Sequence, residues 1–303
     1  MMKASLTVIL LMLMQISFAQ YQIGLVPRVS PDRAVYQKIG YTEVQVKYGS
    51  PAVKNREIWG ELVPYGQLWR AGANNATTVE LSDAITVDHN QLDSGKYALF
   101  IIPKEGETWT VIFNKVHKQW GASGYDEKND ALRVEVKPGK APSRTENLTY
   151  SIRQLGYQHG SIVLQWDDIE LEIPFETSYL TRFQQKVETR ASDQPEYLQW
   201  IVYLQGADHL EQIDAETDVA LLWINQAEQV MQTTEEWNEQ FYPRDYVKGH
   251  LYWTKAKLLA KTENYSEAGN YAQRMKALQN TIFYDRKSEA EDIDTQIELW
   301  TRK

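Results

Sequence analysis

The spacing of apolar residues changes once along this chain, and the change sets the expected fold class. Between Ala34 and Phe175, apolar side chains alternate with polar ones, which is the period of a strand with one buried and one wet face. After Phe175, apolar residues recur every three or four positions, as in an amphipathic helix. The sequence therefore predicts a β region followed by an α region.

The alternation is clearest in three segments, which run from Thr42 to Tyr48, from Leu132 to Val136 and from Ile169 to Phe175. The last segment contains Pro174, which cannot donate a ladder hydrogen bond and so indicates an edge or terminal strand. Two more continuously apolar segments, 97–102 and 109–113, are joined by a short polar connection with a proline and a glycine. They predict a hairpin between two central strands.

Other apolar segments raise the expected number of strands to roughly nine, with Gly, Pro, Asn and Asp between them. Short strands at this spacing favour an antiparallel β-sandwich or jelly-roll-like domain. A parallel sheet would need crossover helices, for which residues 29–176 leave no room. We therefore expect a β-sandwich domain at residues 29–176.

Helical periodicity after residue 176 predicts an α-helical domain at residues 177–303. The expected helices run from Tyr179 to Arg190, Glu196 to Gln205, Ala215 to Gln232, Asp245 to Thr262, Ser266 to Gln279 and Ser288 to Trp300. Pro195 and Pro243 fall near two of the starts, where proline is tolerated.

The helical pair near 245–279 resembles the helix-turn-helix unit of a tetratricopeptide repeat. Its small and aromatic packing positions are occupied by Ala256, Leu259, Tyr265 and Ala268. Lys255 stands where the repeat has a large apolar residue. An ordinary helical hairpin with small residues at its crossing explains the pattern equally well. On either interpretation the helices favour a domain that binds a protein partner.

Residues 1–19 have the parts of a secretory signal peptide: Lys3 near the start, a short apolar run, and small residues before Gln20. We expect cleavage there, an N-terminal linker at residues 20–28, and a periplasmic or secreted protein. The apolar run is about half the length that crosses a bilayer as a helix. No later segment is as apolar, so we expect no integral membrane segment after cleavage.

The composition excludes several kinds of chemistry. The chain has no cysteine, which excludes disulfides, thiolate metal sites and a cysteine nucleophile. With 32 basic and 41 acidic residues its net charge is −9, so nucleic acid is a poor candidate partner. A cysteine-free exported protein must be held together by its apolar core.

The stretch from Lys54 to Thr78 has the densest set of residues suited to binding. The pair Trp69 and Arg70, with the side-chain amides of Asn74 and Asn75, could stack on and hydrogen-bond a sugar or a similar polar ligand. A structural alternative uses the same residues. In it, Trp59 and Trp69 plug one end of the sandwich while Arg70 and Asn74 hold the loop through backbone hydrogen bonds.

No sequence motif for catalysis or for metal binding matches this chain. The histidines are scattered without ligand spacing, at His89, His117, His159, His209 and His250. No G-x-S-x-G elbow, phosphate-binding loop or dinucleotide fingerprint is present. We therefore expect no metal, no cofactor and no catalytic residue that the sequence can assign, and the pattern favours a non-enzymatic protein.

Several segments together resemble one protein family. They are Ser30-Pro31-Asp32-Arg33-Ala34, Arg56-Glu57-Ile58-Trp59-Gly60, Trp69-Arg70-Ala71-Gly72-Ala73-Asn74, Trp109-Thr110-Val111-Ile112-Phe113-Asn114 and Trp120-Gly121. On these segments, residues from about 29 to 175 are similar to the bacterial domain-of-unknown-function family 2911, which is common in exported proteins. The resemblance implies no reaction, substrate or cofactor. Its pattern does group Trp69, Arg70, Asn74, Asn114 and Trp120 as one set.

Three functions fit these observations. The first is a non-enzymatic module of the cell envelope that binds a glycan or another polar ligand, while the helices bind protein. Its candidate ligand-binding residues are Trp59, Trp69, Arg70, Asn74, Asn114 and Trp120. The second is a hydrolase that acts on glycans or envelope polymers, with distant acids brought together by the fold. The third is a purely structural β domain joined to a helical protein-interaction domain.

Overall fold

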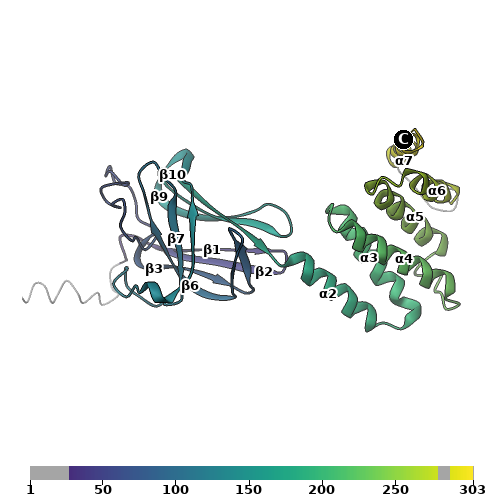
Figure 1. Ribbon diagram of the computed structural model, residues 1–303, viewed down its shortest axis with the longest axis horizontal. Coiled ribbons are helices and arrows are strands. Elements are labelled where there is room, and N and C mark those ends of the chain that lie inside the picture. The colour runs from purple at the N-terminus through teal and green to yellow at the C-terminus, as the bar shows by residue number, and fades with distance from the viewer. Residues whose placement is uncertain (1–26, 279–286, 303) are drawn as a thin grey trace, which may run out of the picture. The chain divides into compact units, whose positions relative to one another are not determined.

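The computed structural model describes residues 27–278 and 287–302 (Figure 1). Contacts between Cα atoms divide the chain after Tyr179 into a β unit and a helical unit. The predicted order, antiparallel β followed by α, is confirmed. The predicted signal peptide at 1–19, and residues 20–26 of the predicted linker, lie outside the described residues. No helix within the described ranges is long and apolar enough to cross a membrane.

Two antiparallel sheets make up the β unit. Their strands are β1 (Asp32–Ile39), β2 (Thr42–Gly49), β3 (Ala73–Leu81), β4 (Ile85–Val87), β5 (Asn90–Leu92), β6 (Gly95–Ile102), β7 (Trp109–Asn114), β8 (Asp130–Val136), β9 (Gly139–Gln154) and β10 (His159–Thr177). The six-stranded sheet has the order β1-β2-β3-β6-β7-β8, and the four-stranded sheet has the order β5-β4-β10-β9. The main apolar core combines inward-facing side chains of both sheets, such as Val46 and Leu164.

Alternation along the strands decides which side chains enter the core. In β2, Val46 and Tyr48 are buried, while Lys47 between them is exposed. The predicted central hairpin is confirmed, because β6 and β7 pair with Leu99 directly opposite Phe113. Both faces of these two strands are buried, with Leu99 in the main core and Phe100 in a second cluster, which explains why their sequences are more continuously apolar.

Two features of the four-stranded sheet differ from expectation. The strand β10 was expected to be an edge or terminal strand; it is the last strand along the chain, but it lies between β4 and β9 and not at an edge. Pro174 is tolerated there because β10 pairs with β9 only as far as Glu170 and with β4 only from Glu176. The strands β4 and β5 have three residues each, which is too short for alternation to show.

A second, smaller apolar cluster lies on the outer face of the six-stranded sheet. Ala98, Phe100 and Ile112 are fully buried there, and they pack against Tyr125 from the loop between β7 and β8. That loop, residues 115–129, therefore covers the outer face over β6 and β7. It contains the single-turn 3-10 helix η1 (Glu127–Asn129), whose first turn is capped by Asp126.

Antiparallel helical hairpins make up the helical unit (Figure 1). Its elements are α2 (Tyr179–Ser192), η2 (Glu196–Leu198), α3 (Gln199–Gln212), α4 (Thr217–Thr233), α5 (Arg244–Lys261), α6 (Tyr265–Ala277) and α7 (Lys287–Thr301). The helix predicted to begin at Glu196 is a 3-10 turn followed by α3. Pro195 and Pro243 precede η2 and α5, as the sequence indicated. Gln279, the expected end of the fifth helix, lies outside the described residues.

The positions that resemble a tetratricopeptide unit lie between α5 and α6. Ala256, Leu259 and Ala268 are buried in one apolar cluster, which also contains Trp300 of α7. Lys255 is buried as well, with its ammonium 2.6 Å from a carboxylate oxygen of Glu228. An ion pair thus occupies the place of the large apolar residue of a repeat. Whether the pair is a true repeat stays a prediction.

Candidate binding groove

Trp59 and Trp69 belong to a cluster of four tryptophans at the core. The ring centroid of Trp59 lies 4.8 Å from that of Trp109 and 5.7 Å from that of Trp69. Trp166 completes the cluster, 5.9 Å from both Trp59 and Trp69. Trp59 is only 8% exposed, and Trp69 is half-buried with its indole N–H donating to the carbonyl of Gly72. These two residues fill the interior more than they line a surface.

The two candidate asparagines hold loops in place. Asn74, in the left-handed region at φ 63°, donates its side-chain amide to the carbonyl of Ser30 at 2.9 Å. Asn114 is fully buried and donates to the Asp126 carbonyl at 3.0 Å and to an Asp130 carboxylate oxygen at 2.8 Å. Asn114 therefore fixes both ends of the 3-10 turn η1 in the loop over the outer sheet face.

Trp120 is the one candidate tryptophan that reaches solvent, with 59% of its surface exposed. Its backbone is nonetheless fixed. An isolated bridge joins it to Asn75, and the amide of Gly121 donates to the carbonyl of Asn74 at 3.1 Å. The guanidinium of Arg28 lies 5.7 Å from the centre of its ring. A large apolar side chain is thus held in water on a well-anchored segment.

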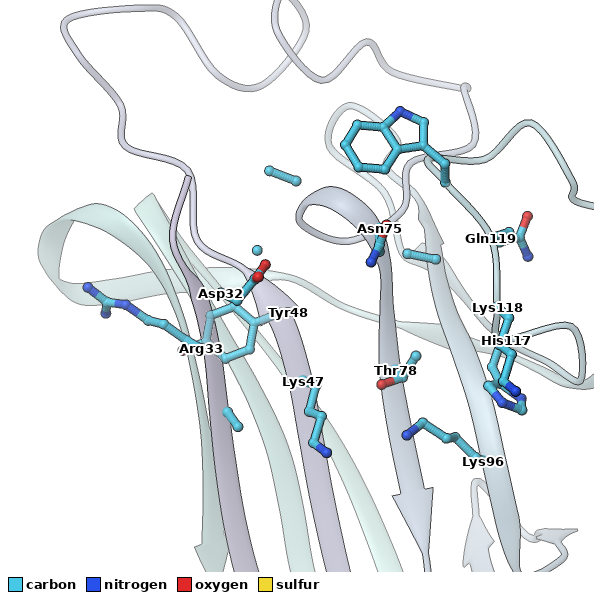
Figure 2. A pocket seen from close by; sticks show the side chains of 15 residues that line it. Asp32, Arg33, Lys47, Tyr48, Asn75, Thr78, Lys96, His117, Lys118 and Gln119 are labelled. Carbon is cyan, nitrogen blue, oxygen red and sulfur yellow. The ribbon is translucent and has the colours of Figure 1, made fainter. Parts of the chain in front are cut away.

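Trp120 lines a groove of about 780 Å³ on the outer face of the six-stranded sheet. The floor is formed by β1, β2 and β3, beside the area that the 115–129 loop covers. Lys47 and Thr78 lie directly opposite each other in the β2–β3 ladder and so share this face. Figure 2 shows Lys47 and Thr78 on the strands, with His117 and Lys118 on the loop across from them.

The groove is cationic in a chain whose net charge is −9. Lys47, Lys96 and Lys118 line it, and Asp32 is the one carboxylate among the described lining residues. Lys96 pairs with Glu80 at 3.0 Å, and its hydrogen bond lowers the pKa of that carboxyl group. Lys47 and Lys118 have no ion-pair partner within the described part of the chain. Two ammonium groups that are in no described ion pair therefore line the groove.

Arg70 lies in a different place, in a smaller cavity of about 280 Å³ that Trp69 and Trp166 also line. The candidate residues thus separate. Trp69 and Arg70 share this cavity and Trp120 lines the groove, whereas the remaining three candidates, Trp59, Asn74 and Asn114, line neither.

Sequence reasoning named Asn75 as a possible ligand-binding amide, but it missed Lys47 and Lys118 as lining residues of the groove. A lysine on the wet face of a strand has the same local pattern whether it lies beside a groove or on open surface. The information that would place Lys47 in the groove is long-range, because the alignment of Lys47 with Thr78 depends on the register of two strands about thirty residues apart.

No metal-binding arrangement is found in the described ranges, where no three His, Asp or Glu side chains are grouped for one ion. In the helical unit, Phe241 is 70% exposed and Tyr246 is 56% exposed, close to the start of α5. Exposed aromatic side chains are common at protein interfaces. A protein partner for the helices stays a prediction.

Residues 30–175 match the model of a family described as "Protein of unknown function (DUF2911)". The β unit belongs to this family. The resemblance inferred from the sequence is therefore confirmed for this part of the chain. All residues that line the groove lie within the matched range. The residues that line the Arg70 cavity also lie within it, apart from Val29. No curated protein and no solved structure matches the chain.

Proposed function

We propose that the DUF2911 domain binds an acidic glycan in the groove beside Trp120. The observation that carries this proposal is that an exposed indole lines the same groove as Lys47 and Lys118, which have no ion-pair partner among the described residues. A protein with net charge −9 would repel an anionic polymer in general, so a local cationic groove gives the ligand a defined place.

The side chains supply three complementary contacts. The face of Trp120 is apolar and wide enough to pack against a sugar ring, while its N–H edge stays in water. The exposed side-chain amide of Asn75 offers donors and an acceptor for sugar hydroxyl groups. The ammonium groups of Lys47 and Lys118 supply positive charge for the carboxylates of a uronic acid.

The size of the groove and the rigidity of its walls suit a glycan ligand. The volume of about 780 Å³ is within the range of ligand sites in proteins, about 300 to 1,000 Å³. The floor is a β-sheet and the wall is a loop tied down by Asn114, so the contact groups are held before the ligand arrives. A preformed site loses less conformational entropy on binding.

A hydrolase is the alternative that the same groove allows. Glycoside hydrolysis generally uses two carboxylates on opposite sides of the scissile bond. Asp32 is the one carboxylate among the described lining residues, and Arg28 pairs with it at 3.3 Å. This arrangement favours binding over cleavage as the proposed function. Product analysis of the bound glycan distinguishes the two.

Replacing Trp120 with alanine is expected to weaken binding of a uronic acid tetrasaccharide at least tenfold, or about 1.4 kcal/mol. Lys47→Gln should weaken it as well, and the loss should shrink as salt is added because the contact is between charges at the surface. Isothermal titration calorimetry at low salt measures both. A neutral tetrasaccharide should bind more weakly to the wild type.

Lys140→Gln is the matched control, because Lys140 is an exposed lysine on β9 in the other sheet. It removes the same charge and should leave the affinity unchanged. Equal affinities for the wild type and Trp120→Ala, or a Lys140→Gln effect as large as that of Lys47→Gln, would contradict the groove as the binding site.

We also propose that the protein is exported, on the basis of the signal-like pattern at residues 1–19. Mass spectrometry of the protein from a bacterial host is expected to show a mature chain that begins at Gln20. The chain should be released with the periplasmic or culture fraction. A cytoplasmic chain that keeps Met1 or Met2 would refute export.

A further inference from the structure

The Arg70 cavity is cationic and has no acidic lining residue within the described chain. Arg70, Arg56 and Lys54 line it, together with the indoles of Trp69 and Trp166 and several aliphatic side chains. The ring planes of the two indoles are nearly parallel, at 19°. The cavity therefore combines positive charge with apolar walls.

Two buried donors of this cavity's lining residues have no hydrogen-bond partner among the described residues. They are the Nε–H group of Arg70 and the indole N–H of Trp166, a residue that is only 1% exposed. A guanidinium and an indole N–H can donate but cannot accept. The missing partner must therefore be an acceptor. Buried donors without partners are rare in folded proteins, so two among the residues that line one cavity are informative.

Arg70 also lacks a counter-charge. No ion pair joins it to a described residue, and residues 1–26 contain no Asp or Glu. Burial lowers the pKa of its guanidinium, because a charge held away from water is destabilised. Arg153 on β9 shows the usual solution, with hydrogen bonds to the carboxylates of Glu170 and Glu172. The described residues supply no such partner for Arg70.

We propose that this cavity binds the carboxylate group of a small ligand with an apolar body, and that Arg70 pairs with that carboxylate. The site lies outside the glycan groove and takes a different ligand, so it goes beyond the function proposed above. A carboxylate provides acceptors for a guanidinium and the single negative charge that Arg70 lacks. The body of the ligand would pack against Trp69 and the aliphatic walls.

Other occupants fit the cavity less well. A water molecule could accept from the Arg70 Nε–H group, but it would leave the guanidinium without a counter-charge. A phosphate group would also find cations there, but it has no apolar body to pack against the indoles and the aliphatic walls. Arg56 is partly engaged, since its guanidinium donates to the carbonyls of Val53 and Ala52. The volume of about 280 Å³ also limits the ligand to a small molecule.

The test titrates the full chain with benzoate, acetate, benzamide and inorganic phosphate by calorimetry at constant ionic strength. Benzoate is expected to bind more tightly than acetate because its ring adds apolar contact, and benzamide, which has the same shape without the charge, should bind at least tenfold more weakly. Arg70→Met should weaken benzoate binding at least tenfold. Arg70→Lys keeps the charge but loses the Nε–H donor, and should give an intermediate affinity.

The melting temperatures of the ligand-free variants show whether Arg70 binds a ligand or stabilises the loop that contains it. Arg70→Met should melt no lower than the wild type, because it removes an unpaired half-buried charge and keeps the length of the side chain. A clear fall in the melting temperature, with no change in benzoate affinity, would mean that Arg70 braces the loop and would overturn the proposal. No binding of either carboxylate up to about 10 mM, or equal binding of benzoate and benzamide, would also overturn it.

The two sites can fail independently. Trp120→Ala changes the groove and should keep benzoate binding, while Arg70→Met changes the cavity and should keep binding of the uronic acid tetrasaccharide. Loss of both ligands in either variant would show that the cavity and the groove are not separate sites, and would overturn the assignment of a second site.

Discussion

Trp59→Ala is expected to lower the free energy of unfolding of the β unit by about 3–5 kcal/mol. The indole of Trp59 is 8% exposed and contacts three other indoles, with the ring of Trp109 nearest at 4.8 Å. Removing it leaves a cavity lined by stiff rings that cannot collapse to fill the space. The loss should therefore include a large cavity contribution beyond the lost apolar burial.

Trp120→Ala is the matched control for this prediction. It is the same substitution in the same domain, but the side chain is 59% exposed and packs against little besides Arg28. Its expected cost is within about 0.5 kcal/mol. Urea unfolding of the full chain, followed by near-ultraviolet circular dichroism, measures both variants. Similar losses for the two would show that Trp59 is not a packed core residue.

The fold class could be predicted because each region repeats one period many times. Strand alternation located β2 and β8, and the change to helical spacing located the start of the α region. The short β4 and β5 have too few residues to show a period. The neighbours of β10 depend on which strands pair, and this information is spread over the whole domain.

The candidate site shows a sharper limit of sequence reasoning. Trp59 and Trp120 are both tryptophans beside a glycine, yet one is in the core and the other in solvent. Nothing local distinguishes them, because burial depends on the segments that fold over each residue. The lack of a partner for Arg70 among the described residues is equally invisible in the sequence, since any of the acids could have supplied one.

Glu228→Ala is expected to destabilise the helical unit by about 3–5 kcal/mol, because it leaves a buried charge without its partner. The Lys255 ammonium lies 2.6 Å from a Glu228 oxygen, and both side chains are about nine-tenths buried. The hydroxyl of Tyr271 also donates to Glu228 at 2.8 Å, and Arg274 lies 3.3 Å from its other oxygen. Loss of the carboxylate therefore affects three partners together.

The double variant Glu228→Gln with Lys255→Met tests this explanation. It removes both charges of the buried pair and keeps an acceptor for Tyr271, while the partly exposed Arg274 can remain solvated. We expect it to be closer to the wild type than the sum of the losses in the single variants Glu228→Gln and Lys255→Met predicts. Urea unfolding followed at 222 nm reports mainly on the helices. Additive losses in the double variant would rule out an energetic coupling between the two charges.

Acidification of the wild type should reproduce part of the stability loss that we expect for Glu228→Ala. Burial opposes the charged form of Glu228, but the hydrogen bonds from Lys255 and Tyr271 outweigh it and lower the pKa of the carboxyl group. A carboxyl group whose pKa is lower in the folded state stabilises the fold above its unfolded value of 4.5, and this contribution is lost as pH falls through the folded value. The Glu228→Gln single variant has no such carboxyl group. Its stability should therefore fall less than that of the wild type between about pH 5 and pH 3, and parallel pH profiles would show that Glu228 is not the group responsible.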